Sequence, residues 1–74
     1  MEKLSKQQAI QQADQFIASQ TLPPDLTAMF QSIREYEGKY LVQYEKIFVE
    51  PRKESPPYLL VIVEPSGEAH WGNP

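Results

Sequence analysis

The chain has 74 residues, no cysteine, seven prolines, three glycines and a formal net charge of −3. A chain of this length is expected to form one domain that buries only about 60% of its unfolded surface, with no disulfide to stabilise it. A pI near 5.0 argues against nucleic-acid binding, and no segment has the roughly 18 apolar residues of a membrane span. Because residues 1–5 lack a basic and apolar leader, we expect a cytoplasmic protein by default, with export by another route left open.

The first predicted element is a helix over about residues 5–20. Ser5 is a suitable N-cap, and Gln8 follows at the spacing of a capping box. Glutamines fill one face, which we expect to be solvated. Pro23-Pro24 cannot continue a helix, so the helix should end near Gln20. The apolar stripe of this helix consists of Ala9, Ile10, Ala13, Phe16 and Ile17.

Residues 24–30 fit either a single helical turn capped by Asp25 or the run-in to a strand, and we expect a short irregular turn. After this segment the sequence pattern changes from one typical of a helix to one typical of strands. Because glutamate is a poor residue at positive φ, we expect a hairpin loop in which Gly38 is left-handed, rather than a two-residue type I′ turn at Glu37-Gly38.

The proline-rich connection over 48–57 is long for a compact domain, and we expect it to be mobile. Segments rich in Tyr, Val, Ile and Leu predict strands over about residues 31–36, 39–47, 58–64 and 68–71.

Residues 64–67, Glu-Pro-Ser-Gly, are the sharpest turn signal in the chain. Proline at the second position and glycine at the fourth suit a three-residue hairpin loop with a bulge. That loop places Val61 opposite Trp71 and Ile62 opposite His70. Two faces follow, one with Leu59, Val61, Val63, Ala69 and Trp71, and the other with Tyr58, Leu60, Ile62 and His70.

The predicted fold class is α+β, with the N-terminal helix packed on one face of a three- to four-stranded antiparallel β-meander. The strand over 58–63 is apolar on both faces, and one helix can cover only one of them. We assign the helix to the face of Val61, Val63 and Trp71. The register of the strand over 39–47 against its neighbour at 58–63 stays open.

The face of Leu60 and Ile62 then needs another cover. One alternative is that the 48–57 loop or the segment Thr27–Phe30 folds over it. The other is that it forms a contact surface for a homodimer or another protein, since small cores often need such help. A protein partner or a homodimer is therefore expected, with no nucleic acid and no membrane.

No residue set typical of an active site or a metal site is recognisable. One histidine and no cysteine exclude the usual zinc constellations, and no glycine-rich loop resembles a phosphate cradle. His70 could act as a general base, but no nucleophile is tied to it, and we interpret it as an ordinary strand residue. Glu35 and Glu37 we interpret as a solvated pair that protects a sheet edge. We expect no enzyme activity and no cofactor.

Three tyrosines, Tyr40, Tyr44 and Tyr58, have two interpretations. They can hold the sheet together by cross-strand aromatic packing, or they can form a stacking platform for a small ligand or a peptide under the proline-rich loop. Together with the second sheet face, they define the candidate protein-interaction surface, which consists of Tyr58, Leu60, Ile62, His70, Tyr40 and Tyr44.

Two stretches resemble the PepSY-type small α+β modules. Residues Leu4 to Ala13, with a capped start, Ala-Ile and a later alanine, look like that family's helix opening, and Tyr58 to Ala69 look like its closing hairpin. The tail from Pro57 to Gly72 is also similar to the end of small bacterial immunity proteins of the YrhB type. Both resemblances imply a helix on an antiparallel sheet that binds another protein and carries out no catalysis, and the YrhB-type resemblance implies that this partner is a toxin. Neither supplies a catalytic residue. From the two-sided apolar strand we expect a non-enzymatic protein-binding, inhibitory or regulatory module.

Overall fold

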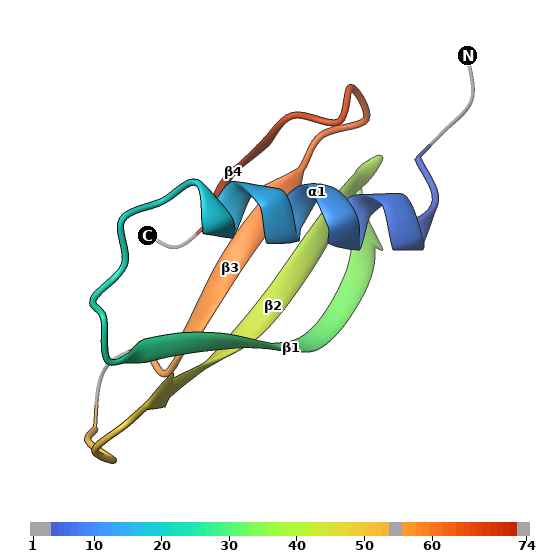
Figure 1. Cartoon of the computed structure of the whole chain (residues 1–74). Helices are drawn as coiled ribbons and strands as arrows, with labels where there is room; N and C mark the ends of the chain where they lie inside the picture. The colour runs from blue at the N-terminus through green and yellow to red at the C-terminus, as the bar shows by residue number, and fades with distance from the viewer. Residues whose placement is uncertain (1–3, 54–55, 73–74) are drawn as a thin grey trace.

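The computed structural model describes residues 4–53 and 56–72. Within these residues, one helix, α1 (Lys6–Ala18), precedes the strands β1 (Leu26–Tyr36), β2 (Lys39–Phe48), β3 (Tyr58–Val63) and β4 (Ala69–Trp71). All neighbouring strands pair antiparallel in the order β1-β2-β3-β4, and α1 lies across one face of the sheet (Figure 1). The predicted α+β class and the antiparallel meander are confirmed.

The helix begins as its capping residues predict. The Ser5 side chain accepts a hydrogen bond from the backbone N–H of Gln8 (3.1 Å), and the Gln8 side chain accepts one from the backbone N–H of Ser5 (2.9 Å). Two N–H groups that have no partner inside the helix are thereby satisfied. Ala9 and Ala13 are fully buried against the sheet, and their small side chains let the helix approach the strands closely.

Strand β1 starts earlier than expected. The irregular turn predicted over 24–30 is wrong from Leu26 onward, because Leu26 to Phe30 pair with Phe48 to Tyr44 of β2. After Phe30 the register shifts by one residue, and the extra residue, Gln31, forms a β-bulge. Hydrogen bonds to a partner strand that is distant in sequence stabilise this segment, and local propensity does not report them.

The β1–β2 turn also differs from the expectation. Tyr36 pairs with Lys39, so the loop has two residues, and both have positive φ, Glu37 at 50° and Gly38 at 80°. Two left-handed residues in this position form a type I′ turn. The prediction that glutamate would avoid that conformation is wrong, since the twist of the two paired strands imposes it.

The β3–β4 hairpin has the predicted register. Val61 lies opposite Trp71, Ile62 opposite His70 and Val63 opposite Ala69. Gly67 has a φ of 95°, and its N–H donates to the Glu64 carbonyl (2.8 Å). A turn whose residues demand one geometry fixes the pairing of the strands on either side of it.

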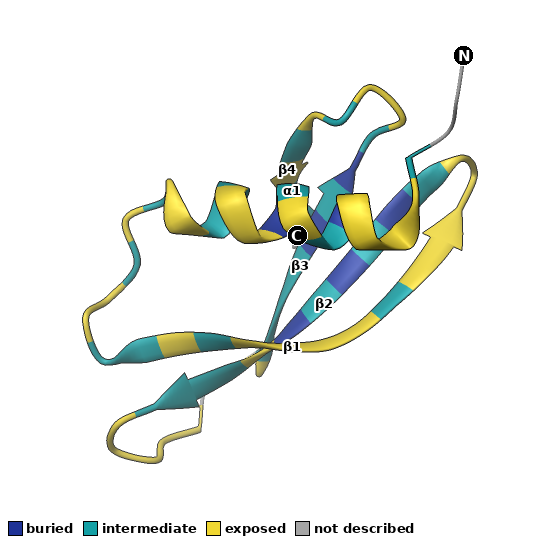
Figure 2. Ribbon diagram, turned by 45° about the vertical axis from the view of Figure 1, so that its right-hand side comes forward, coloured by how far each residue is buried: buried dark blue, intermediate teal, exposed yellow. Residues whose placement is uncertain are grey.

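The core lies between the helix and the centre of the sheet. Among residues 4–53 and 56–72, the buried ones lie in α1, β2 and β3, and β1 carries none (Figure 2). Val42, Val61 and Val63 are fully buried, and the Phe16 and Trp71 rings meet edge to face at 5.0 Å. The helix therefore covers the face of Val61, Val63 and Trp71, as the sequence predicts. Residues 54 and 55 of the loop expected to be mobile lie outside the described residues.

Candidate functional site

The sheet face opposite α1, here called the helix-free face, carries most of the residues singled out from the sequence. The β2–β3 register places Leu41 opposite Ile62, Gln43 opposite Leu60 and Glu45 opposite Tyr58. Side chains that lie directly opposite each other in an antiparallel pair point to the same face. His70 joins this face through its pairing with Ile62. Tyr58, Leu60, Ile62 and His70 are thus brought together as expected.

Tyr40 and Tyr44 do not belong to this face. They lie opposite Val63 and Leu59, so they point under the helix, where they are 6% and 3% exposed. The grouping of these two residues with Tyr58 in one surface is wrong. Alternation along β2 separates two sets of side chains but does not say which set faces the helix.

Each buried tyrosine hydroxyl has a partner. Tyr40 donates to the Leu4 carbonyl (2.8 Å), and Tyr44 donates to Oδ1 of Asp14 on the helix (2.5 Å). Burial raises the pKa of Tyr44, and the hydrogen bond to Asp14 and the charge of Asp14 act in the same direction. These rings hold the helix on the sheet, which matches the packing interpretation of the tyrosines, and they lie on the other face of the sheet from Tyr58.

The apolar centre of the helix-free face is partly covered from the C-terminal end. Gly72 donates its N–H to the Leu60 carbonyl (2.7 Å), and a Cβ placed on Gly72 would lie 2.8 Å from Ile62. The backbone there rests directly on the Ile62 side chain. The segment Thr27–Phe30, considered above as a cover, is instead part of β1 and pairs with the far side of β2.

Leu41 is an apolar residue of this face that the sequence analysis missed. It lies opposite Ile62 and is half-buried, like Leu60 and Tyr58 beside it. The alternation along β2 already separated Leu41 from Tyr40 and Val42. Only the register against β3 shows that it adjoins Ile62, and the connection between β2 and β3 is too long for its length to fix this register.

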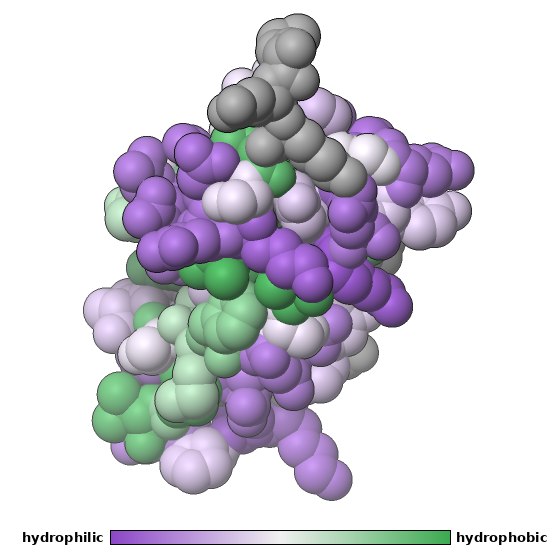
Figure 3. Space-filling view, turned by 90° about the vertical axis from the view of Figure 1, so that its right-hand side faces the viewer, coloured by the Kyte–Doolittle hydropathy of each residue, from purple (hydrophilic) through white to green (hydrophobic). Residues whose placement is uncertain are grey.

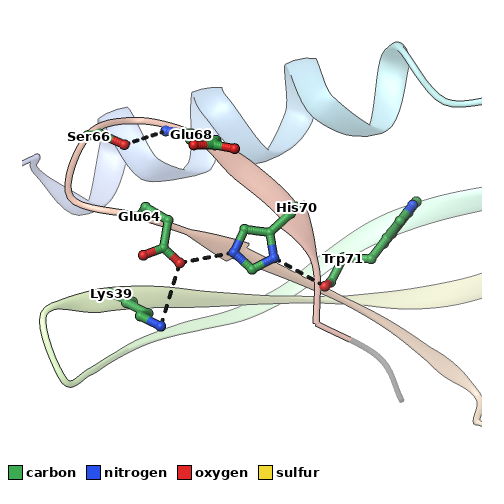
Figure 4. A network of polar contacts seen from close by, with 6 residues as sticks. All are labelled: Lys39, Glu64, Ser66, Glu68, His70 and Trp71. Carbon is green, nitrogen blue, oxygen red and sulfur yellow. Dashed lines mark hydrogen bonds and ion pairs between the residues drawn. The ribbon is translucent and has the colours of Figure 1, made fainter.

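A polar cluster lies at the end of this face where β2 begins and β3 ends. Glu64 receives a hydrogen bond from Nε2 of His70 (2.9 Å) and lies 3.6 Å from Nζ of Lys39, so that side chains from β2, β4 and the end of β3 converge (Figure 4). Nδ1 of His70 lies 3.3 Å from the Trp71 carbonyl oxygen. Both ring nitrogens therefore have partners within the chain.

The ionisation of this cluster is shifted in favour of the ion pair. The hydrogen bond from His70 lowers the pKa of Glu64, and the charge of Lys39 adds to that effect. The same hydrogen bond raises the pKa of His70. The Lys39 and His70 side chains are largely solvent-exposed and that of Glu64 is half-buried, so the cluster forms a charged rim beside the apolar centre of the face. In the described part of the chain, no group of three or more His, Cys, Asp and Glu residues is arranged to hold a metal ion.

A recess of about 410 Å³ lies at the opposite end of the molecule, where the chain enters β1 and leaves β2. Two charged residues that line the recess form an ion pair, with Nη2 of Arg52 3.6 Å from Oδ2 of Asp25. The Arg52 guanidinium also stacks over the Phe48 ring, 4.1 Å from the ring centroid. The recess shares no residue with the helix-free face. Its lining consists of Pro24, Asp25, Val49, Glu50, Pro51 and Arg52.

No helix in the described residues is long and apolar enough to cross a membrane. Comparison of the chain with protein-family models, with curated proteins and with solved structures finds no match. The PepSY-type and YrhB-type resemblances therefore remain predictions that rest on the two stretches named above.

Proposed function

We propose that this chain is a non-enzymatic protein-binding module whose docking surface is the helix-free face. The observation that carries the proposal is the composition of that face, which has an apolar centre and a charged and polar rim. Leu41, Leu60 and Ile62 adjoin one another across β2 and β3, while Lys39, Glu64 and His70 close one end. This is the anatomy of a typical protein interface.

The partner that fits is a protein with an apolar patch bordered by hydrogen-bonding groups of both charges. The rim carries both signs, since Lys39 and His70 bracket Glu64 at one end and Glu45 stands beside Tyr58 at the other. Such a rim contributes to specificity and orientation more than to affinity, because its groups stay solvated. The affinity would come from burial of the apolar surface of the central leucines and Ile62. Both resemblances found in the sequence also imply binding to another protein.

The test compares Leu60→Asp with Gln11→Asp, which places the same charge on the solvated face of α1. Each protein is used to capture partners from a lysate of its source organism and is titrated against each captured protein after purification. We expect Leu60→Asp to weaken binding by about a hundredfold, an interface hot-spot effect, and Gln11→Asp to leave it unchanged.

Both variants must be folded for the comparison to count, and Trp71 fluorescence together with far-ultraviolet circular dichroism reports this, since Trp71 packs on Phe16 of the helix. A folded Leu60→Asp protein that binds its partners as tightly as the parent chain would overturn the proposal. Leu41→Asp, on the adjacent strand, serves as the second variant if Leu60→Asp does not fold.

A further inference from the structure

Strand β1 leaves one long edge of the sheet open. Within the described residues β1 pairs only with β2, whereas the other edge strand, β4, has three residues. Edge strands are normally protected by shortness, charge or proline. The first half of β1, Leu26–Phe30, is here called the edge segment, and it contains no charged residue, no proline and no glycine.

The edge segment is also apolar and exposed. Met29 and Phe30 are 53% and 44% exposed, and neighbouring Val49 is 80% exposed. The helix packs on β2, β3 and β4, and the edge segment runs out below it with the end of β2 (Figure 1). Figure 3 shows apolar side chains gathered below a band of hydrophilic ones and continuing towards the lower left of that view.

The molecule exposes more surface than its mass requires. Its accessible surface is 5324 Å², whereas a compact monomer of 8.5 kDa exposes about 4,700 Å². The excess is on the order of the 800 Å² that each partner buries in a standard protein interface. The molecule is elongated, with extents of 45 × 20 × 19 Å, and the β1–β2 ribbon projects below the helix (Figure 1).

We infer that the edge segment pairs antiparallel with the edge segment of a second copy of this chain. A two-fold axis perpendicular to the sheet puts one residue opposite its own copy. With Ala28 on that axis, Leu26 lies opposite Phe30 of the second copy, and Thr27 lies opposite Met29. The smallest side chain then stands on the axis between two Leu–Phe pairs, and no charged group is brought into the contact.

The second half of β1 does not suit the same contact. A two-fold axis at Arg34 or at Glu35 would place like charges directly opposite each other, which destabilises a strand pair. The bulge at Gln31 interrupts the ladder between the two halves and changes the direction of the strand. The self-complementary sequence and the open edge therefore coincide in the edge segment, and this favours a second copy over an unrelated strand.

The pairing has a consequence for the surface described above, although it does not depend on the proposed function. A two-fold axis perpendicular to the sheet leaves both helices on one side and both helix-free faces on the other. The dimer is then an eight-stranded sheet with two docking faces on the same side, related by the axis. A partner with two equivalent sites would be bound bivalently.

The chain has no cysteine, so single cysteines test this register directly. We expect Ala28→Cys to form a disulfide-linked dimer about tenfold faster than Gln11→Cys on the helix or His70→Cys on the helix-free face, because only position 28 meets its own copy. Faster linkage at His70→Cys would overturn the edge contact in favour of face-to-face association. Faster linkage at Thr27→Cys or Met29→Cys would overturn the assigned register.

Sedimentation equilibrium at several concentrations supplies the second measurement. Met29→Lys adds a charge to an exposed position of the edge segment and should raise the dimer dissociation constant by about tenfold or more. Tyr36→Lys is the matched control, since Tyr36 is 59% exposed on the same strand but lies outside the paired segment. A parent chain that stays monomeric at all concentrations, or a Met29→Lys protein that dimerises as well as the parent, would overturn the inference. Leu60→Asp should dimerise normally, which separates this test from that of the proposed function.

Discussion

Tyr44 links the sheet to the helix through a single hydroxyl. The ring is buried beneath α1, Phe30 meets it edge to face at 6.2 Å, and its hydroxyl reaches Asp14 on the helix. Because the pKa of Tyr44 is raised, the hydroxyl stays protonated as a donor throughout the neutral range. Asp14 itself is exposed, so it remains hydrated when the Tyr44 hydroxyl is removed. The loss of stability is then limited to the contribution of this hydrogen bond.

We predict that this bond contributes about 1 kcal/mol to the free energy of unfolding. The measurement is a double-mutant cycle of Tyr44→Phe, Asp14→Ala and the double variant in urea, followed by Trp71 fluorescence. The cycle cancels the gain in helix propensity that alanine brings at position 14. Additive effects, with no coupling between the two sites, would contradict the prediction.

At the scale of elements, the β1–β2 hairpin holds one residue in an unfavourable conformation. Glu37 has a φ of 50°, and a left-handed residue other than glycine costs roughly 1–2 kcal/mol. Asparagine tolerates this region better and is favoured in type I′ turns. We predict that Glu37→Asn raises the free energy of unfolding by about 0.5 to 1 kcal/mol, measured by urea denaturation.

Two variants isolate the backbone effect in that prediction. Glu37→Gln removes the same charge but keeps an unbranched side chain, so it should change stability little. Gly38→Ala should lower the free energy of unfolding by about 1 kcal/mol, although no atom lies within 4 Å of the added Cβ, because Gly38 has a φ of 80°. If Glu37→Gln stabilised the chain as much as Glu37→Asn, charge rather than conformation would be responsible.

The elements that the sequence predicts correctly are those whose signals are local. The capping residues of α1 and the Glu-Pro-Ser-Gly turn between β3 and β4 act over a few residues, and both are confirmed. The first half of β1 was missed because Pro23-Pro24 and Asp25 favour a turn, while the bonds that extend Leu26–Phe30 come from β2. Tertiary pairing overrides local propensity there.

The candidate site was predictable only in part for the same reason. Tyr58, Leu60, Ile62 and His70 follow from the β3–β4 turn, which fixes their shared face. The placement of Tyr40, Tyr44 and Leu41 depends on the β2–β3 register, and the connection between those strands is too long to specify that register by its length. A one-residue change in that register would exchange the two faces of β2.

At the scale of the whole molecule, the cluster of Lys39, Glu64 and His70 couples ionisation to global unfolding, since it joins β2, β4 and the end of β3. The lowered pKa of Glu64 means that its contribution to stability is present above its ordinary value of 4.5 and is lost as the pH falls through the lowered value. The raised pKa of His70 means that its contribution is present below 6.5 and is lost as the pH rises through the raised value.

We therefore predict that the contribution of this cluster to stability is greatest between about pH 4.5 and 6.5 and decreases on both sides of that window. The measurement is the urea midpoint of the parent chain and of Glu64→Gln from pH 3 to 9, taken at low ionic strength because exposed pairs are screened by salt. The difference between the two proteins should be largest inside the window and smaller once the pH has risen through the raised pKa of His70, because only the Lys39 charge then still faces Glu64. A difference that stays constant across the whole range would contradict the coupling, because removal of the Glu64 charge would then act independently of the proton on His70.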